Sequence, residues 1–148
     1  MLTWTTYGTW LQGDKRGYVK GGEVIRGNRH FWRLNKANQK ERAVRLGKEE
    51  REIVKAAILE EAMKSGQKIY SIAVCTNHVH IAAKHMDEPI ETLVARYKNS
   101  SRQALKRKGF TGRVWTKGYD KRYCFNEEAL QARVDYVRRH CGAVKAGG

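Results

Sequence analysis

Apolar residues recur every three or four positions in three segments of the chain, and this spacing predicts amphipathic helices. The helices are expected at residues 48–64, 87–108 and 127–141. Asp87 is expected as the N-cap of the second helix, with Pro89 in its first turn, and Asn126 as the N-cap of the third. Gly66 and Gly109 follow the first two helices, and glycine is typical of such a stop.

Four other segments are rich in β-branched and aromatic residues and are expected to be strands. They are residues 2–11, 68–74, 77–84 and 115–125. Only a tight turn separates the second strand from the third, so the two form an antiparallel hairpin. This hairpin places residues 77–84 in the interior of a sheet and not at its edge.

The order strand, helix, strand, strand, helix, strand, helix predicts an α+β fold, an antiparallel sheet with helices on one face. It matches the ferredoxin-like or RRM-like split βαβ plan, extended by a C-terminal helix that carries Tyr136. Residues 1–148 are interpreted as a single domain. Residues 14–46 have weak periodicity and many basic residues and glycines, so we expect a long basic insertion there, with a short helix near residues 36–45.

The charge balance indicates a polyanionic partner. Lys and Arg number 30 against 15 acidic residues, which gives a formal net charge of +15. Nucleic acid is the first expectation for such a surface, and an anionic membrane surface the second.

Two other patterns concern the compartment. No apolar run approaches the roughly 18 residues needed to span a bilayer, and no signal-peptide core follows Met1, so we expect a soluble, cytoplasmic protein without a membrane partner. Cys75, Cys124 and Cys141 are scattered and form no C-x-x-C pair. This favours reduced thiols over a disulfide framework or a thiolate zinc site.

The most informative short pattern is a histidine pair in the third expected strand. His78 and His80 alternate with Val79 and Ile81, so both imidazoles project from one face, about 7 Å apart along the strand. Such a pair suits one divalent metal ion or one phosphate. An H-x-H triplet also arises by chance, so a metal site and two structural histidines both remain open on this pattern alone.

The last expected helix carries a second group of candidate residues. Leu130, Val134, Val137 and Cys141 form a narrow apolar stripe that should pack on the sheet. Tyr136 and His140 are four residues apart and lie on the shoulder of this stripe. Taken alone, a tyrosine and a histidine beside an apolar stripe are ordinary. Together with the histidine pair, they allow three imidazoles and a phenol to converge.

Three strings carry a resemblance to a known family. They are Thr76-Asn77-His78-Val79-His80, Trp115-Thr116-Lys117-Gly118 and Asp135-Tyr136-Val137. With the opening segment at residues 2–11, they make the chain resemble the single-tyrosine HUH transposases, and among these the REP-associated tyrosine transposases. The resemblance covers nearly the whole chain and is weakest at residues 21–46.

The resemblance implies specific roles. His78 and His80 would hold a divalent metal, Mg²⁺ or Mn²⁺, and Tyr136 would attack a scissile DNA phosphate, leaving a 5′-phosphotyrosine and a free 3′-OH. The third ligand in the family is commonly a glutamine four residues after the tyrosine, and His140 occupies that position here. Three imidazoles without a carboxylate shift the preference from Mg²⁺ toward Mn²⁺ or a later first-row metal. Relatives cut beside DNA hairpins and include both monomers and homodimers, so either state is expected.

Basic residues gather between residues 96 and 122, where Asp120 is the only acid. Cations that follow a phosphate backbone, with aromatic rings between them, are typical of single-stranded DNA binding. We expect the DNA-binding cations to be Lys98, Arg102, Lys106, Arg107, Arg113, Lys117 and Arg122. The aromatic residues that could stack on bases are Tyr97, Phe110, Trp115, Tyr119 and Tyr123, although Tyr97, like Phe125, is also expected in the core.

A second class of function stays in play at this point. A catalytically inactive or domesticated nucleic-acid-binding protein could use the same RRM-like sheet. The enzyme is favoured because His78, His80 and Tyr136 are all present. A two-histidine phosphoesterase is disfavoured, because it needs two separate histidine strands.

Overall fold

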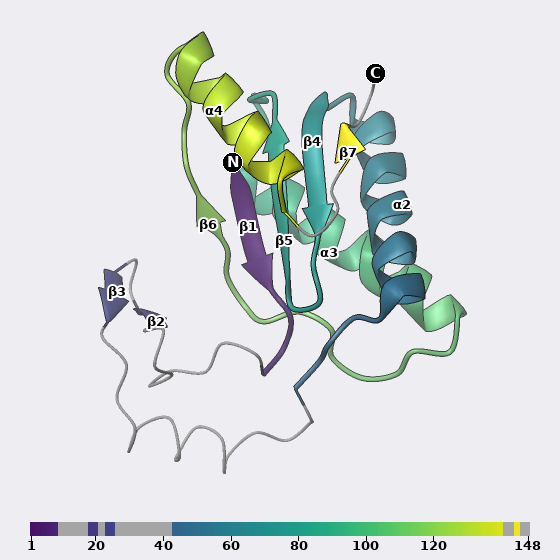
Figure 1. The fold of residues 1–148 in the computed structure, drawn as a ribbon. Coiled ribbons are helices and arrows are strands. Elements are labelled where there is room, and N and C mark those ends of the chain that lie inside the picture. The colour runs from purple at the N-terminus through teal and green to yellow at the C-terminus, as the bar shows by residue number, and fades with distance from the viewer. Residues whose placement is uncertain (9–17, 21–22, 26–42, 141–143, 146–148) are drawn as a thin grey trace.

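The computed structural model describes residues 1–8, 18–20, 23–25, 43–140 and 144–145 (Figure 1). Its helices are α2 (Lys48–Ser65), α3 (Ile90–Arg107) and α4 (Glu127–Arg138). Its strands are β1 (Leu2–Thr5), β2 (Tyr18–Lys20), β3 (Glu23–Ile25), β4 (Ile69–Val74), β5 (His78–Ala83), β6 (Asp120–Lys121) and β7 (Val144–Lys145). The predicted α+β fold is therefore confirmed.

The main sheet has the strand order β6-β1-β5-β4-β7, and all of its pairings are antiparallel. The strands β1, β4, β5 and β6, with α2 after the first and α3 after the third, follow the ferredoxin-like plan. The strand β5 lies between β1 and β4, as the sequence predicted for the histidine strand. The strands β2 and β3 form a separate two-stranded sheet.

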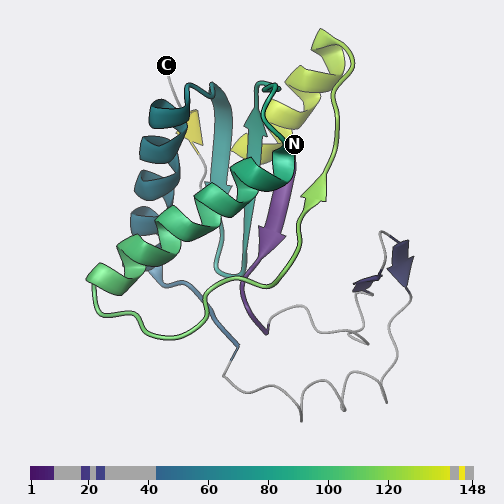
Figure 2. The same cartoon turned by 180° about the vertical axis from the view of Figure 1, so that it is seen from behind.

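The helices divide between the two faces of the sheet. The helices α2 and α3 cover one face, and α4 lies across the other (Figures 1 and 2). The main apolar core lies under α2 and α3, where Trp4, Ile72, Val79 and Ile81 are at most 2% exposed. Under α4 is a smaller cluster, in which Val134 and Val137 contact short side chains of β4 and β5. The face under α4 therefore has room for polar side chains.

Several boundaries differ from the sequence-based expectation. The N-cap of α3 is Pro89 and not Asp87, because α3 begins only at Ile90. The expected strand at residues 115–125 is reduced to the two residues of β6 and an isolated bridge between Thr6 and Trp115. Of the short helix expected near residues 36–45, residues 43–45 are not helical, and the rest lies outside the described residues. Helix α4 ends at Arg138, earlier than expected.

Two single-residue predictions were wrong. Phe125 was expected in the core but is 90% exposed, because β6 ends before it and α4 begins only at Glu127. The cysteines were expected to be reduced, and Cys124 is free, but Cys75 is disulfide-bonded. Among the helices that the structure describes, none has the length and apolarity to cross a membrane.

Candidate metal and tyrosine centre

The histidine pair lies in the middle of the sheet, on the face under α4. In the register of β1 and β5, Thr3 is opposite His80 and Thr5 is opposite His78. Residues that are paired across antiparallel strands project to the same face. Both threonines therefore share a face with the two histidines, while Val79 and Ile81 point into the core on the other side.

Helix α4 brings the third histidine over this face. Val134 and Val137 pack against the small residues Ala73 and Ala82, and the Ser71 hydroxyl donates to the Val134 carbonyl at 3.2 Å. Small residues on the sheet side allow the helix to lie close to the strands. As a result, the C-terminal end of α4 is held beside the histidine pair.

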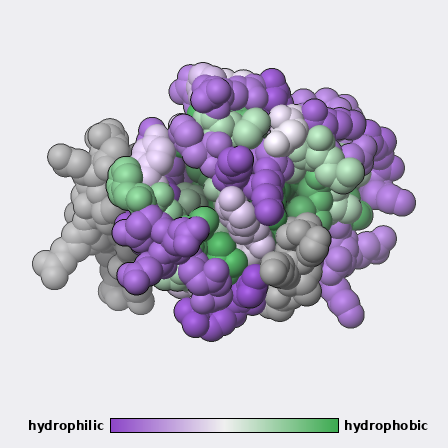
Figure 3. All heavy atoms as spheres, turned by 90° about the horizontal axis from the view of Figure 1, so that it is seen from above, coloured by the Kyte–Doolittle hydropathy of each residue, from purple (hydrophilic) through white to green (hydrophobic). Residues whose placement is uncertain are grey.

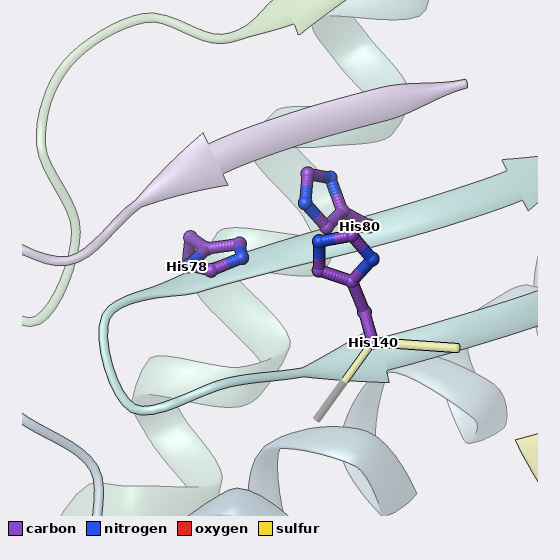
Figure 4. Close-up of side chains that lie close together, drawn as sticks. All are labelled: His78, His80 and His140. Atoms are coloured by element: carbon purple, nitrogen blue, oxygen red, sulfur yellow. The ribbon is translucent and has the colours of Figure 1, made fainter. Parts of the chain in front are cut away.

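The three imidazoles converge (Figure 4). The ring centroid of His80 lies 4.7 Å from that of His78 and 4.8 Å from that of His140. One nitrogen from each ring can be chosen so that the three atoms lie within 4.8 Å of one another. The predicted convergence of His140 with the strand pair is present in the structure, although His140 lies two residues after the end of α4 and not within the helix.

Each imidazole has an oxygen next to its Nδ1 atom. Nδ1 of His78 lies 2.7 Å from Oδ1 of Asn77, and Nδ1 of His80 lies 2.8 Å from the Thr3 hydroxyl. Nδ1 of His140 lies 3.0 Å from the carbonyl oxygen of Tyr136. A proton on each Nδ1 can be donated to these oxygens, which leaves Nε2 as the lone-pair nitrogen of each ring.

His80 is adapted to the neutral, ligating form. It is 8% exposed, and burial, together with the neighbouring His78 and His140, lowers its pKa to about 4. At neutral pH its imidazole is therefore uncharged. A neutral imidazole is the form that coordinates a metal ion.

These residues fit a divalent metal ion. Two nitrogens bound to one ion at about 2.1 Å can be at most about 4.2 Å apart, so the cluster is only slightly wider than a closed site. Three nitrogen donors without a carboxylate suit a first-row transition metal better than Mg²⁺, which prefers oxygen ligands.

Tyr136 lies beside the three imidazoles and is also accessible to solvent. Its ring centroid is 4.3 Å from that of His140 and 5.6 Å from that of His80, and the residue is 36% exposed. Tyrosine is commonly half-buried with its hydroxyl near a polar partner. Here the ring lies at the edge of the histidine cluster, on the side that solvent reaches.

The W-T-K-G segment borders the same face of the sheet. The Thr116 and Thr5 hydroxyl oxygens are 2.6 Å apart, and the Thr116 backbone N–H donates to the Thr5 carbonyl at 3.1 Å. Lys98, on α3, donates to the carbonyls of Thr116 and Gly118 at 3.0 and 2.6 Å. Burial lowers the pKa of this ammonium group. Lys98 therefore holds the segment in place through its backbone.

The structure separates the predicted DNA-binding cations into two groups. Arg102, Lys106 and Arg107 are exposed on α3, which covers the face opposite the histidines. Lys117 and Arg122 are exposed on either side of the edge strand β6, and the Arg122 side chain is 3.2 Å from the Asp120 carboxylate. Arg113 lies over the Tyr7 ring, 5.0 Å from its centroid. The histidine cluster and the α3 cations are therefore not on one surface.

The predicted base-stacking aromatics are mostly buried. Tyr97 is fully buried, Trp115 is 7% exposed, and Phe110 and Tyr119 pack against the main core. Tyr123 is the one of the five that is largely exposed, at 51%.

Two polar residues of the site were missed by the sequence analysis. They are Thr3 and Asn77, whose oxygens lie beside His80 and His78. Asn77 directly precedes the histidine strand and could have been found from sequence. Thr3 could not, because its position next to His80 depends on the register between β1 and β5.

A comparison with known protein families gives the context for this geometry. The family described as Transposase IS200 like matches residues 37–140, which is well over half of the chain and includes the three histidines and Tyr136. No curated protein matches the chain. The chain belongs to the IS200-like transposase family, the tyrosine HUH endonucleases that nick single-stranded DNA.

Proposed function

We propose that Tyr136 is the nucleophile of this transposase and that His78, His80 and His140 hold its divalent metal. The observation that carries the proposal is the convergence of three imidazoles beside the Tyr136 ring, at the end of a helix that packs on their strand. Tyrosines elsewhere on the described chain lack this set of neighbours: Tyr97 is buried on the opposite face, and Tyr123 is next to His85.

The chemistry requires the phenol to lose its proton. The Tyr136 oxygen then bonds to the scissile phosphorus, and the bond from phosphorus to the 3′-oxygen breaks. The 3′-oxygen takes up a proton and leaves as a free 3′-OH, while the 5′ end remains on Tyr136 as a phosphotyrosine. Because this ester conserves the phosphodiester bond energy, the strand can be rejoined to another 3′-OH without ATP.

A metal ion bound by the histidines would supply positive charge to a non-bridging phosphate oxygen, where negative charge develops. The contribution of the chain is to hold the ligand nitrogens in place through Asn77, Thr3 and the Tyr136 carbonyl. We propose Mn²⁺ as a better fit than Mg²⁺, because the donor set is made of nitrogen atoms.

The substrate proposed is a single strand that lies next to a DNA hairpin. Lys117 and Arg122, beside the edge strand β6, and Arg113, over the Tyr7 ring, are suited to the single-stranded part. The cations of α3, Arg102, Lys106 and Arg107, are suited to the duplex stem, because they lie on the other side of the sheet. Lys98 is proposed to support binding by holding the W-T-K-G segment. A monomer and a homodimer are both compatible with this arrangement.

The test is a covalent adduct. The protein is incubated with Mn²⁺ and a hairpin that carries a single-stranded flank, and it is then analysed under denaturing conditions. The parent should give a band of protein joined to DNA, because a phosphotyrosine is a stable ester. Tyr136→Phe removes only the attacking oxygen, so the adduct should disappear while DNA binding is retained.

Tyr119→Phe and Tyr123→Phe are the matched controls and should keep the adduct. An adduct that persists in Tyr136→Phe would contradict the assignment and move the chemistry to another tyrosine. Parent protein that binds the hairpin but gives no adduct with Mn²⁺ or Mg²⁺ would overturn the proposal in favour of a catalytically inactive DNA-binding protein.

A further inference from the structure

The described part of the chain exposes four large hydrophobic or aromatic side chains to a marked degree: Met63, Tyr123, Phe125 and Tyr136. Tyr136 is accounted for by the site above. Tyr123 and Phe125 lie in the segment that joins β6 to α4, and they are 51% and 90% exposed. Leaving such rings in water forgoes the free energy of burying them, so an exposed pair that lies close together calls for an explanation.

These two rings belong to a row of three, which we call the aromatic row: His85, Tyr123 and Phe125. The ring centroids of His85 and Tyr123 are 6.2 Å apart, and those of Tyr123 and Phe125 are 6.1 Å apart. The rings are tilted by 60° and 36° and do not lie face to face. A spacing of about 6 Å leaves no space for another ring between them, so a planar partner must stack on an outward face.

The backbone on either side of the aromatic row is held in place. The Arg122 N–H donates to the Met1 carbonyl at 2.8 Å, and the Asn126 side chain accepts the Ala129 N–H at 2.7 Å as the N-cap of α4. Tyr123 and Phe125 are thus exposed on a segment that is fixed at both ends. Rigid aromatic side chains lose little conformational entropy when they bind a partner.

The cavity side of the row is basic. A cavity of about 220 Å³ adjoins it, and among its lining residues are Lys84, His85, Lys121, Arg122 and Tyr123, with no acidic residue. The Lys121 ammonium lies 5.7 Å from the Tyr123 ring centroid. Figure 3 shows this end of the molecule, where hydrophilic side chains surround smaller hydrophobic areas. Glu127 and Glu128, in the first turn of α4, carry negative charge and repel phosphates. The phosphates of a bound strand should therefore lie on the side of the row where the lysines are.

We propose that the aromatic row is a stacking platform for unpaired bases of the single-stranded DNA. This inference rests on the proposed function, because it takes the DNA strand that the transposase cuts as the ligand. One base stacks on the outward face of Phe125, and its neighbour stacks on Tyr123. Lys84 and Lys121 contact the phosphates between them. Aromatic rings with flanking cations are the usual means of binding a single strand without reading its sequence.

The position of the row relates it to the reaction. Phe125 precedes α4 and Tyr136 lies near its end, and the helix from Glu127 to Tyr136 spans about 14 Å at 1.5 Å per residue. A strand held on the row extends along α4 toward Tyr136. The row therefore anchors the single-stranded flank at a distance from the bond that is cut.

The test compares two DNA probes of equal length, an oligothymidylate and a strand of abasic sites. Both carry the same phosphates, but only the first has bases. Fluorescence anisotropy at one fixed salt concentration gives the dissociation constant of each, in a Tyr136→Phe background that excludes covalent capture. The variant Tyr123→Ala/Phe125→Ala should bind oligothymidylate about 5- to 150-fold more weakly for each base that no longer stacks. Its affinity for the abasic strand should be unchanged.

Met63→Ala is the matched control, because Met63 is 84% exposed on α2, on the opposite face of the sheet. It should alter neither dissociation constant. Phe125→Tyr keeps a ring and should bind as the parent does, whereas Phe125→Leu keeps an apolar side chain without a ring and should bind as Phe125→Ala does. Thermal unfolding of each variant confirms that the fold is retained.

Three results would overturn the platform. The first is an equal loss of affinity for both probes in Tyr123→Ala/Phe125→Ala, and the second is full affinity of Phe125→Leu for oligothymidylate. The third is a change of oligomeric state in Tyr123→Ala/Phe125→Ala, because it would assign the row to an interface between two copies of the chain. The test is independent of the nucleophile. Parent protein that forms no adduct would contradict the role of Tyr136 and leave these binding measurements valid.

Discussion

The two faces of the central sheet have opposite properties, although they share the same strands. On the face under α2 and α3, Trp4 stacks on Tyr97 with ring centroids 6.4 Å apart, and the Trp115 N–H donates to the Ser101 hydroxyl at 3.0 Å. This face is closed, and its polar groups are mostly paired inside it. On the face under α4, the apolar packing is sparse, and its buried members are alanine, cysteine and valine side chains. The histidines and Tyr136 occupy the rest, partly open to solvent.

The comparison shows how a small domain can keep a functional site at the middle of its sheet. The thick core on one side provides most of the apolar burial, so the other side is free to hold polar groups. Because β5 contributes to both faces, the core that fixes Val79 and Ile81 also fixes the backbone of His78 and His80. A site built on such a strand is held more rigidly than one on a loop.

The largest expected effect is a difference between substitutions at two adjacent residues of β5, Ile81 and His80, whose side chains point to opposite faces of the sheet. Ile81→Ala removes a fully buried side chain from the core. It should lower the free energy of unfolding by about 2–5 kcal/mol, measured by urea denaturation. His80→Ala should change it by about 1 kcal/mol and abolish Mn²⁺ binding in calorimetry, as well as the covalent adduct. The division between the faces would be contradicted if both variants lost the same free energy of unfolding and His80→Ala still bound Mn²⁺.

The next effect concerns the support of the metal ligands. Thr3→Val keeps the shape of the side chain but removes the hydroxyl beside Nδ1 of His80. Removing such a partner typically costs about 10- to 100-fold in metal affinity, and we expect that loss in a Mn²⁺ titration. Thr3→Ser retains the hydroxyl and should bind within a few-fold of the parent. Unchanged affinity in Thr3→Val would mean that the imidazole is oriented by packing alone.

A smaller effect is expected from the cations of α3. Charge reversal at Arg102, Lys106 and Arg107 should weaken hairpin binding alike for all stem sequences. It should reduce the salt slope by about 0.9 for each DNA phosphate that the protein no longer neutralises. Binding of an unstructured single strand should be affected much less, because these residues lie on the closed side of the sheet. If single-strand binding fell equally, the single strand would have to bind α3 as well.

The last effect, confined to acidic pH, is a pH dependence of stability in the metal-free protein. Burial lowers the pKa of His80 from 6.5 to about 4. Between these pH values the unfolded chain binds a proton that the folded chain does not, so the free energy of unfolding should fall as the pH falls through this window. His80→Asn removes the titrating group, and its stability should fall less over the same range. An identical slope in both proteins would place the effect on another residue.

The sequence alone was sufficient for features that depend on local periodicity. Alternation along a strand put His78 and His80 on one face, and the helical repeat put His140 on the same side as Tyr136, although α4 itself ends at Arg138. The hairpin, the helix α2 and the Asn126 cap were also predictable, because turns, glycine stops and caps act within a few residues. The family resemblance added the roles of these residues, which periodicity does not contain.

Other features were decided only by tertiary structure. The pairing of Thr3 with His80 depends on strand register, and the separation of Arg102 from the histidines depends on which face α3 covers. The sequence could not predict that Phe125 is exposed, because an aromatic residue between two elements is buried only if another element covers it. Local backbone geometry repeats along the chain and can be counted from the sequence. The packing of distant segments depends on how all the elements fit together, and only the folded chain determines it.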